Sequence, residues 1–479
     1  MTEKLKILPT PKGWWKNGEN CFVEEKICGD FEGARAAFCE DAKRCGFDFS
    51  DGEGGIYVEK DAAMERGEYK LCIKDSKVLL SSGGEEGAHY GFATLLQLMK
   101  KYDGKLLLES VTVCDKPDCA YRGLLVDCAR SLHPVALMEK YVDMCRLYKI
   151  KYLHIHFSDD ESYALPSKAF PLLTTEGRSY TEDDIARLRS YASSRGVSIV
   201  PEIDTPGHST VLQQKYPEVF GDKGILKFTQ SAIDGTKQLY RELCELFPES
   251  EYIHIGGDES RLGWWIDCPE SEAYGRQCGY LPEDSAPGMS SAEYLMLRYL
   301  AHFIAENAKT VISCGKKPIV WEGFHKITNG MIPKECSVMV FDSSYQLTSS
   351  LVSDGFDVIN CSWLPTYVVT PTWFYSESDC FDWDICSYGT INEASPYCGG
   401  MMRLPYNSHM IGGQLSSWGD TVEKSFETPA VGRSDEFEKI RRRLPYISEN
   451  TWNISKRTDF DSAADTLCAA DKVLDALTR

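Results

Sequence analysis

Short apolar runs alternate with longer amphipathic stretches in the part of the sequence that follows about residue 119. Each run has the length of a buried strand, and the stretches between most of them carry apolar residues at helical spacing. Eight strands that alternate with helices over about 360 residues predict a (β/α)8 barrel, also called a TIM barrel. The apolar runs are 123–126, 152–157, 197–201, 252–255, 318–321, 338–341, 357–360 and 411–415, and the clearest amphipathic stretches are 135–148, 182–194, 236–246, 292–308 and 345–352.

The first part of the chain has a different pattern. Segments 67–73 and 78–81 are rich in strand-forming residues and flank a short polar turn, which is a hairpin signal. Segment 86–101 carries leucines at helical spacing. We therefore expect a small α+β accessory domain over residues 1–118, followed by the catalytic barrel over residues 119–479.

Composition and charge narrow the range of partners. With 43% hydrophobic and 26% charged residues, the chain has ordinary globular composition and can bury a sizeable core. Its 52 Lys and Arg against 72 Asp and Glu give a net charge of −20, which argues against nucleic acid or an anionic membrane as partner. A neutral substrate fits this balance, and so does the simple solubility of a cytosolic protein.

Nineteen cysteines are scattered along the chain, and no two have the C-x-x-C spacing of zinc clusters and redox motifs. We therefore expect no metal and no other cofactor. The first residues lack the apolar core of a secretory signal, and no apolar run approaches the roughly 18 residues of a membrane span. These features predict a cytoplasmic protein whose thiols are mostly small buried hydrophobes.

Reactive or sugar-compatible side chains follow each of the eight apolar runs. Barrel enzymes build their sites at the carboxyl ends of the strands, so these side chains are expected to meet at one mouth. Loops are polar in general, but the same bias after all eight runs favours a site. The side chains are Asp127, Arg130, Asp159, Asp160, Glu202, Asp204, His208, Asp258, Glu259, Trp321, Glu322, Asp342, Trp363, Tyr367, Trp418 and Asp420.

The strongest motif is His254-Ile-Gly-Gly-Asp-Glu259, in which an apolar run leads into two glycines and two adjacent carboxylates. Glycines allow a ligand to approach the backbone closely. Crowded carboxylates tend to have split pKa values, so that one is protonated near neutrality while the other is ionised, as a general acid and a charged orienting group require. The alternative is an exposed turn with solvated acids, which the neighbouring Trp264-Trp265 disfavours.

Three further polar residues suit carbohydrate chemistry. Arg130 can donate forked hydrogen bonds to vicinal hydroxyls, although it could also simply pair with Asp127 across a loop. Asp159 can hold a histidine, and the Pro-Gly turn before His208 could aim that imidazole over the barrel mouth. Trp321, Trp363 and Trp418 could pack against sugar rings, although tryptophan is also a common core residue.

The pair His154-x-His156 allows a rival hypothesis. Two histidines on one face near the end of a barrel strand could bind a metal, as in metal-dependent TIM-barrel hydrolases. The other ligands that such a site needs are not evident at matching strand ends, and core histidines bonded to a neighbouring layer are commoner.

Five ordered motifs carry a resemblance that covers nearly the whole chain. They are Arg-Gly…Asp-x-x-Arg from Arg122, His-x-His-x-x-Asp-Asp from His154, Pro-Glu-x-Asp-x-Pro-Gly-His from Pro201, His-x-Gly-Gly-Asp-Glu from His254, and Trp-Gly-Asp from Trp418. In this order they resemble glycoside hydrolase family 20, the β-N-acetylhexosaminidases. Residues 1–118 are similar to the accessory α/β domain of that family.

The resemblance implies a role for each matching residue. Glu259 matches the general acid/base, and Asp258 matches the carboxylate that orients the 2-acetamido group and stabilises an oxazolinium intermediate. Asp159 and His208 match the pair that supports the acid. The implied substrate contacts are Tyr367 at the acetamido oxygen, Arg130 at the 3- and 4-hydroxyls, Trp321 and Trp418 as pocket walls, and Asp420 at distal hydroxyls, with Trp363 and Phe341 as further substrate-binding candidates.

Three positions depart from the family pattern. Asp420 is one methylene shorter than the glutamate that many members carry, Phe341 stands near a frequent tryptophan, and Ser131 follows Arg130 where histidine is frequent. These departures put the preference between GlcNAc and GalNAc in doubt, but not the type of reaction.

The implied activity is an exo-acting, retaining β-N-acetylhexosaminidase that hydrolyses terminal non-reducing β-linked GlcNAc or GalNAc by substrate-assisted catalysis. Its partner would be an oligosaccharide or glycoconjugate with a terminal N-acetylhexosamine, and a homodimer is compatible with the sequence. One alternative is a related enzyme of the lacto-N-biosidase type, which releases a disaccharide. A non-catalytic sugar-binding barrel would be marked by loss of a site carboxylate, whereas both are present.

Overall fold

The computed structural model describes residues 5–479, and its larger part is a closed barrel of parallel strands. Each strand pairs in parallel with the next one along the sequence, and the last pairs with the first, which closes the barrel. The predicted (β/α)8 fold is confirmed. The strands are β11 (Tyr121–Asp127), β12 (Tyr152–His156), β13 (Ser198–Glu202), β14 (Tyr252–His254), β15 (Lys317–Trp321), β16 (Ser337–Val340), β17 (Asp357–Asn360) and β22 (Met410–Ser417).

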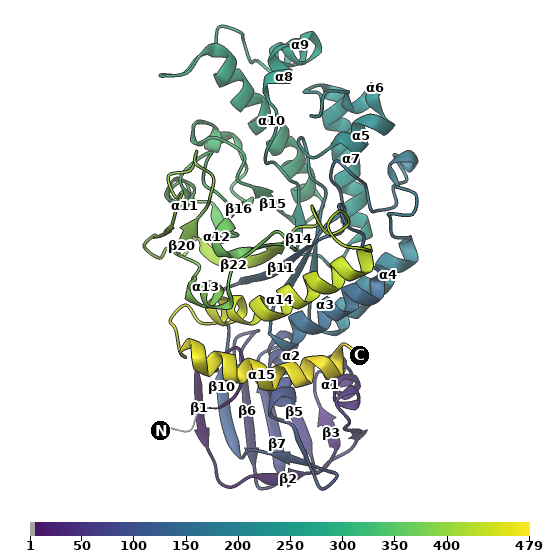
Figure 1. Ribbon diagram of the computed structural model, residues 1–479, viewed down its shortest axis with the longest axis vertical. Coiled ribbons are helices and arrows are strands. Elements are labelled where there is room, and N and C mark those ends of the chain that lie inside the picture. The colour runs from purple at the N-terminus through teal and green to yellow at the C-terminus, as the bar shows by residue number, and fades with distance from the viewer. Residues whose placement is uncertain (1–4) are drawn as a thin grey trace.

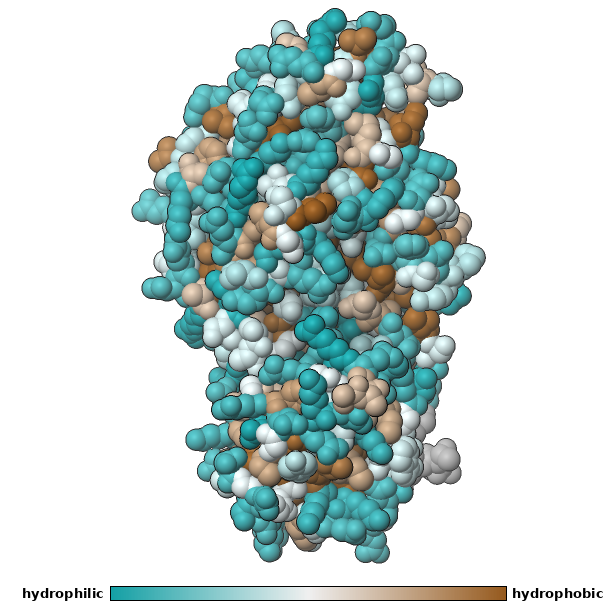
Figure 2. Space-filling view, turned by 180° about the vertical axis from the view of Figure 1, so that it is seen from behind, coloured by the Kyte–Doolittle hydropathy of each residue, from teal (hydrophilic) through white to brown (hydrophobic). Residues whose placement is uncertain are grey.

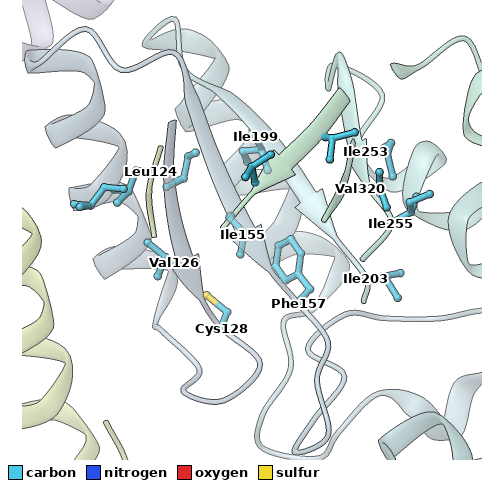
Figure 3. Close-up of a cluster of buried hydrophobic side chains, with 14 of the residues drawn as sticks. Leu124, Val126, Cys128, Ile155, Phe157, Ile199, Ile203, Ile253, Ile255 and Val320 are labelled. Atoms are coloured by element: carbon cyan, nitrogen blue, oxygen red, sulfur yellow. The ribbon is translucent and has the colours of Figure 1, made fainter. Parts of the chain in front are cut away.

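Side chains on the barrel strands alternate between two environments, as strand geometry requires. Leu124, Val126 and Ile155 belong to the cluster that packs outward against the helices (Figure 3). Leu125 and Tyr152 belong to a separate cluster inside the barrel. The helices between the strands are α3 (Val135–Leu147), α4 (Glu182–Ser194), α7 (Gln230–Leu246), α10 (Ser291–Ser313) and α11 (Thr348–Ser353), and α14 (Pro429–Trp452) follows β22.

A segment of more than forty residues lies between β17 and β22. It contains the hairpin of β18 (Tyr367–Val369) and β19 (Trp373–Phe374), and β18 pairs in parallel with β22. This pairing places Tyr367 beside Ser416 at the carboxyl end of the barrel. The segment continues through α13 (Glu377–Asp382), β20 (Ser387–Gly389) and β21 (Met401–Arg403).

The amino-terminal part of the chain forms a second sheet at one end of an elongated molecule (Figure 1). Helices α1 (Glu32–Arg44) and α2 (Glu85–Leu98) pack against each other and against this sheet, whereas α15 (Phe460–Leu477) lies against α1, α2 and the barrel helix α3 (Figure 1). In order, the strands are β1 (Gly13–Lys16), β10 (Val111–Asp115), β6 (Tyr69–Lys74), β7 (Lys77–Ser82), β5 (Ile56–Lys60), β3 (Lys26–Gly29) and β4 (Ser50–Asp51).

The surface is largely hydrophilic on the face shown in Figure 2, with apolar side chains scattered between polar ones. Within residues 5–479, no helix combines the length and the apolar character that a membrane crossing requires.

Candidate active site

A cavity of about 290 Å³ lies at the carboxyl ends of the barrel strands. Of the residues to which the family resemblance gave a role, all except Trp321 line it, whereas the other expected mouth residues Asp127, Asp160, Glu202, Glu322 and Asp342 do not. The lining residues are Arg130, His156, Asp159, Asp204, His208, Asp258, Glu259, Phe341, Trp363, Tyr367, Val369, Trp373, Trp418 and Asp420.

The two adjacent carboxylates reach the cavity through a tight turn after β14. Gly256 and Gly257 have φ angles of 72° and 117°, which suit glycine, and Glu259 itself has a φ of 41°. A Cβ atom on Gly256 would lie 1.8 Å from the Asp204 Oδ1 atom. The glycines therefore allow two loops to pack closely, and the strained backbone at Glu259 is typical of a functional position.

Asp258 and Glu259 have pKa values that are shifted in opposite directions. Burial, with the nearby Glu259 charge, raises the pKa of Asp258 to about 6. A hydrogen bond from His208 lowers the pKa of Glu259, whose side chain is 56% exposed. In the unliganded site Asp258 therefore holds a proton more readily than Glu259 does, because Glu259 has a cationic partner and access to solvent.

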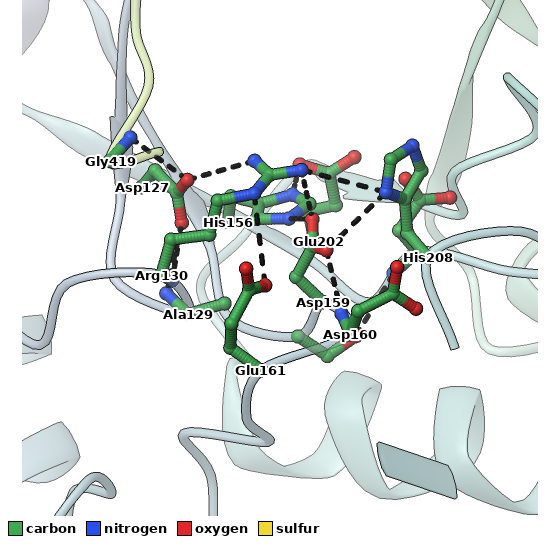
Figure 4. A network of polar contacts seen from close by, with 12 residues as sticks. Asp127, Ala129, Arg130, His156, Asp159, Asp160, Glu161, Glu202, His208 and Gly419 are labelled. Carbon is green, nitrogen blue, oxygen red and sulfur yellow. Dashed lines mark hydrogen bonds and ion pairs between the residues drawn. The ribbon is translucent and has the colours of Figure 1, made fainter. Parts of the chain in front are cut away.

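A chain of polar contacts supports Glu259 from behind, and Figure 4 shows the part of it that joins His208 to Asp159. The His208 Nε2 atom lies 3.3 Å from Glu259 Oε2, and its Nδ1 atom lies 3.3 Å from Asp159 Oδ1. Burial opposes the charged form of His208, but the two carboxylates raise its pKa. His208 has a φ of 43°, so the predicted turn before it does aim the ring toward the mouth.

Arg130 is surrounded by carboxylates. Its guanidinium lies 2.9 Å from Asp127, 2.6 Å from Asp159 and 3.7 Å from Asp420. Glu161, which the sequence did not single out, lies 3.9 Å away. Arg130 therefore pairs with Asp127, as the simpler hypothesis held, and also lines the cavity.

Aromatic rings form the walls of the cavity. The ring of Tyr367 lies 5.4 Å from Trp363 and 6.0 Å from Trp418, and Trp373 lies 4.8 Å from Trp363. The structure corrects the expectation that Trp321 is a wall, because its side chain is only 1% exposed. Trp321 stands behind the wall, with its ring centroid 5.9 Å from that of Trp418.

Some lining residues were given no role from the sequence. Asp204 was expected at the mouth because it follows an apolar run, in the same motif as His208, and it does line the cavity. Burial, together with the Asp258 charge, raises its pKa well above the usual range. Trp373 lies on a hairpin whose position depends on pairing with β22, so no local pattern indicated it.

Polar contacts with carboxylates and with the side-chain amide of Gln414 surround the pair His154 and His156. The Nδ1 atom of His156 lies 2.6 Å from Glu202, and its Nε2 atom lies 2.9 Å from Asp159. His154 Nε2 lies 3.1 Å from Glu202. Both nitrogens of His156 are therefore engaged, so the structure favours a core polar network over the metal hypothesis.

Comparison with known protein families gives a clear result. The model described as "Glycosyl hydrolase family 20, catalytic domain" matches residues 119–452, and "Glycosyl hydrolase family 20, domain 2" matches residues 37–116. A barrel with paired carboxylates in an aromatic cavity is compatible with the class of glycosyl hydrolases, and the family model shows that class. The chain belongs to glycosyl hydrolase family 20.

Individual relatives agree with this result. The beta-hexosaminidase of Vibrio furnissii is 27% identical over 69% of this chain and 57% of that protein. The beta-hexosaminidase of Akkermansia muciniphila is 33% identical over 43% of this chain and 48% of that protein. The chain thus spans about half the length of these two relatives. The human beta-hexosaminidase subunit beta is 26% identical over 83% of this chain and 68% of that protein.

The solved structure of a GH20 exo beta-N-acetylglucosaminidase from Vibrio harveyi, in complex with N-acetylglucosamine, has the same fold. It superposes with a TM-score of 0.81 at 21% identity, over 98% of this chain and 77% of that one.

Proposed function

We propose that the protein is an exo-acting, retaining β-N-acetylhexosaminidase that hydrolyses terminal β-linked N-acetylhexosamine with help from the acetamido group of the substrate. One observation carries the proposal: the buried Asp258 Oδ1 atom has no hydrogen-bond partner within residues 5–479. A buried carboxylate oxygen without a partner is costly, so it fits a site that a ligand donor completes. The acetamido N–H of the sugar is such a donor.

The aromatic walls offer complementary groups. The indole N–H groups of Trp363 and Trp418 are also buried without a partner among the described residues. Both can donate to sugar oxygens while their ring faces cover the apolar side of the sugar. A cavity of about 290 Å³ is at the small end of ligand sites, which suits one sugar ring and supports exo-action over release of a disaccharide.

The geometry suggests the following reaction. The acetamido oxygen bonds to the anomeric carbon as the glycosidic bond breaks, and Glu259 gives its proton to the departing oxygen. Asp258 holds the acetamido N–H and offsets the positive charge on the oxazolinium ring. Glu259 then removes a proton from water, which attacks the same carbon and opens the ring, so the β configuration is retained.

His208 is the proposed source of the proton that the acid donates. His208 binds a proton more tightly than usual in the unliganded site, whereas Glu259 releases one more readily. We infer that the proton passes from His208 Nε2 to Glu259 when the substrate displaces solvent from the exposed carboxylate.

We further propose that the protein works in a reducing compartment such as the cytoplasm. All nineteen cysteines are free thiols, and eight of them are buried. Cell fractionation with an antibody against the native protein is the test, and recovery with extracellular material contradicts this location.

The decisive test compares aryl β-GlcNAc, aryl β-GalNAc and aryl β-glucoside as substrates. We expect hydrolysis of at least one N-acetylated substrate, no comparable hydrolysis of the glucoside, and inhibition by a thiazoline that mimics the oxazolinium ring. Hydrolysis of the glucoside at similar kcat/KM, or a covalent glycosyl–protein ester trapped during turnover, would exclude neighbouring-group participation.

A further inference from the structure

The polar chain behind Glu259 does not end at Asp159 but continues into the barrel interior (Figure 4). Asp159 Oδ2 lies 2.9 Å from His156 Nε2, and His156 Nδ1 lies 2.6 Å from Glu202 Oε2. Carboxylates and imidazoles therefore alternate over five groups: Glu259, His208, Asp159, His156 and Glu202. The last two are fully buried, with exposures of 1% and 0%.

Donor and acceptor counting fixes the charges along this chain. Ionised carboxylates only accept hydrogen bonds, so His156 donates one N–H to each of its two carboxylate partners. An imidazole that donates at both nitrogens is an imidazolium. Although burial opposes both charges, the pKa of His156 lies well above its usual range, and that of Glu202 lies well below its own.

Glu202 is held from several sides. The indole N–H of Trp321 donates to its Oε1 atom at 2.6 Å, and ring nitrogens of His154 and His254 lie 3.1 and 2.9 Å from its carboxylate. Burying an ion pair in a barrel core is generally no more stable than filling the same volume with apolar side chains. Stability alone therefore does not explain why this network stands directly behind the site.

We propose that Glu202 and His156 are positioning residues for the general acid. His156 anchors Asp159, which accepts the Nδ1–H of His208 and so fixes the tautomer of that ring. The Nε2 atom of His208 is then always the one that faces Glu259 and exchanges a proton with it. The inference rests on the proposed function, since it concerns protonation of the departing oxygen.

Other charged groups also face this pair. Within residues 5–479, only the ring of His156 contacts both Glu202 and Asp159, so His156 is the bridge between them. Around the pair lie Asp127 from β11, Arg130 from the loop after it, His154 from β12, Asp204 and His208 from the loop after β13, His254 from β14, and Asp258 from the loop after it.

Glu202→Gln keeps the shape of the side chain and removes its charge. The decisive readout is how strongly the loss of kcat/KM depends on the leaving group of the substrate. The 4-nitrophenolate ion departs with little protonation, whereas a sugar alkoxide must be protonated by Glu259 as it leaves. We expect the fall in kcat/KM to be at least tenfold larger for an unactivated β-linked GlcNAc disaccharide than for the 4-nitrophenyl glycoside. His156→Gln should give the same pattern, which keeps the test open if one variant folds poorly.

The pH profile gives a second readout. Loss of a buried negative charge weakens proton binding by the groups around it, so the basic limb of kcat/KM should move to lower pH in Glu202→Gln. The matched control is Glu436→Gln, which breaks a buried pair of the same kind, at 2.6 Å from His133, outside the cavity. This control should leave both the leaving-group ratio and the basic limb unchanged.

A uniform loss for both substrates in Glu202→Gln and His156→Gln, with an unmoved basic limb, would overturn the inference. It would show that the pair only supports the fold. The proposed function fails separately, if the wild-type protein does not hydrolyse any aryl N-acetylhexosaminide.

Discussion

Asp258 and Glu259 are neighbours in the sequence but have different surroundings. Asp258 faces the cavity with one unpaired oxygen, whereas Glu259 is half exposed and is paired with His208. The sequence predicted two crowded carboxylates with split pKa values. It could not predict which one keeps the proton, because the answer depends on burial and on His208, which comes from the loop after β13.

The raised pKa of Asp258 predicts the acid limb of the pH profile. Asp258 must be ionised to hold the acetamido group, and its pKa is about 6 in the free protein. As pH falls through this value, Asp258 takes up a proton and kcat/KM should decline with a midpoint near pH 6. Steady-state kinetics on an aryl β-GlcNAc between pH 4 and 8 measure this, and a midpoint near pH 4 would mean that Asp258 titrates normally.

The same shift predicts that Asp258 destabilises the free protein. Its pKa rises on folding from 3.8 to about 6, so above pH 6 the folded state carries the full cost of the charge. Asp258→Asn should therefore increase the free energy of unfolding by up to roughly 3 kcal/mol at pH 7.5.

Because the cost disappears once Asp258 is protonated in both states, the gain should shrink as pH falls from 6 toward 4. Urea denaturation of both proteins at pH 7.5 and pH 4.5 is the measurement. An equal increase in the free energy of unfolding at both pH values would mean that the increase does not come from the charge of Asp258. The variant should also lose roughly 10²–10³ in kcat, as expected when one preorganised electrostatic partner is removed.

At the scale of elements, the turn after β14 shows what local patterns can and cannot predict. The sequence indicated a strand followed by two glycines and two acids, and from the sequence we expected the glycines to allow a ligand to approach the backbone closely. The structure gives a different reason, since a side chain at Gly256 would collide with Asp204 from the neighbouring loop. Such contacts between loops arise because the closed barrel brings the two loops together, so they cannot be predicted from the sequence of either loop alone.

Gly256→Ala tests this packing. The new Cβ would meet Asp204 Oδ1 at 1.8 Å and the backbone N of Thr205 at 2.5 Å, in a left-handed backbone conformation. We expect kcat/KM to fall by at least roughly 10²-fold, because a displacement of about 1 Å at a reacting group costs that much.

The control for this substitution is Gly263→Ala, because an added Cβ there would have no atom within 4 Å. It should keep wild-type kcat/KM and thermal stability. If Gly256→Ala is as active as this control, the turn tolerates a side chain and the glycine is not required.

The regular elements were largely predictable, and the hairpin β18–β19 was not. Barrel strands and their helices have a strong local periodicity, which fixes their existence and order. The hairpin has short strands, and its position results from pairing with β22 more than forty residues later. The role of Tyr367 could be assigned only through the family resemblance. Trp373 was missed because its position, like that of Tyr367, depends on this distant pairing.

At the scale of the whole molecule, buried charges join the amino-terminal sheet to the barrel. Lys149, at the start of the segment that leads into β12, is fully buried and contacts Tyr69 at 2.9 Å and Asp115 at 3.3 Å. Its ammonium also lies 4.5 Å from the ring of Trp452. These contacts join residues up to several hundred positions apart. The sequence indicated that the pattern of apolar and polar residues changes near residue 118, but it could not indicate these contacts between distant residues.

Lys149→Ala tests how much the buried contacts of Lys149 stabilise the protein. The substitution leaves Asp115 buried with the indole N–H of Trp452 and the backbone N–H of Lys12 but without its cation. Breaking a buried pair in this way typically costs about 3–5 kcal/mol, so the midpoint of urea unfolding should fall markedly. Activity per folded molecule should stay within about twofold, since the amino-terminal face of a barrel serves stability and the site lies at the other face.

Lys151→Ala is the matched control. Lys151 lies two residues further along the same segment, and its ammonium makes a partly exposed contact with Glu86 at 3.4 Å. Such a pair contributes about 0–1 kcal/mol, so this variant should unfold almost as the wild type does. Equal effects of the two substitutions would contradict a specific role for Lys149. If the Lys149 variant unfolds in two separate steps while the wild type unfolds in one, the buried lysine is what couples the sheet and the barrel into a single cooperative unit.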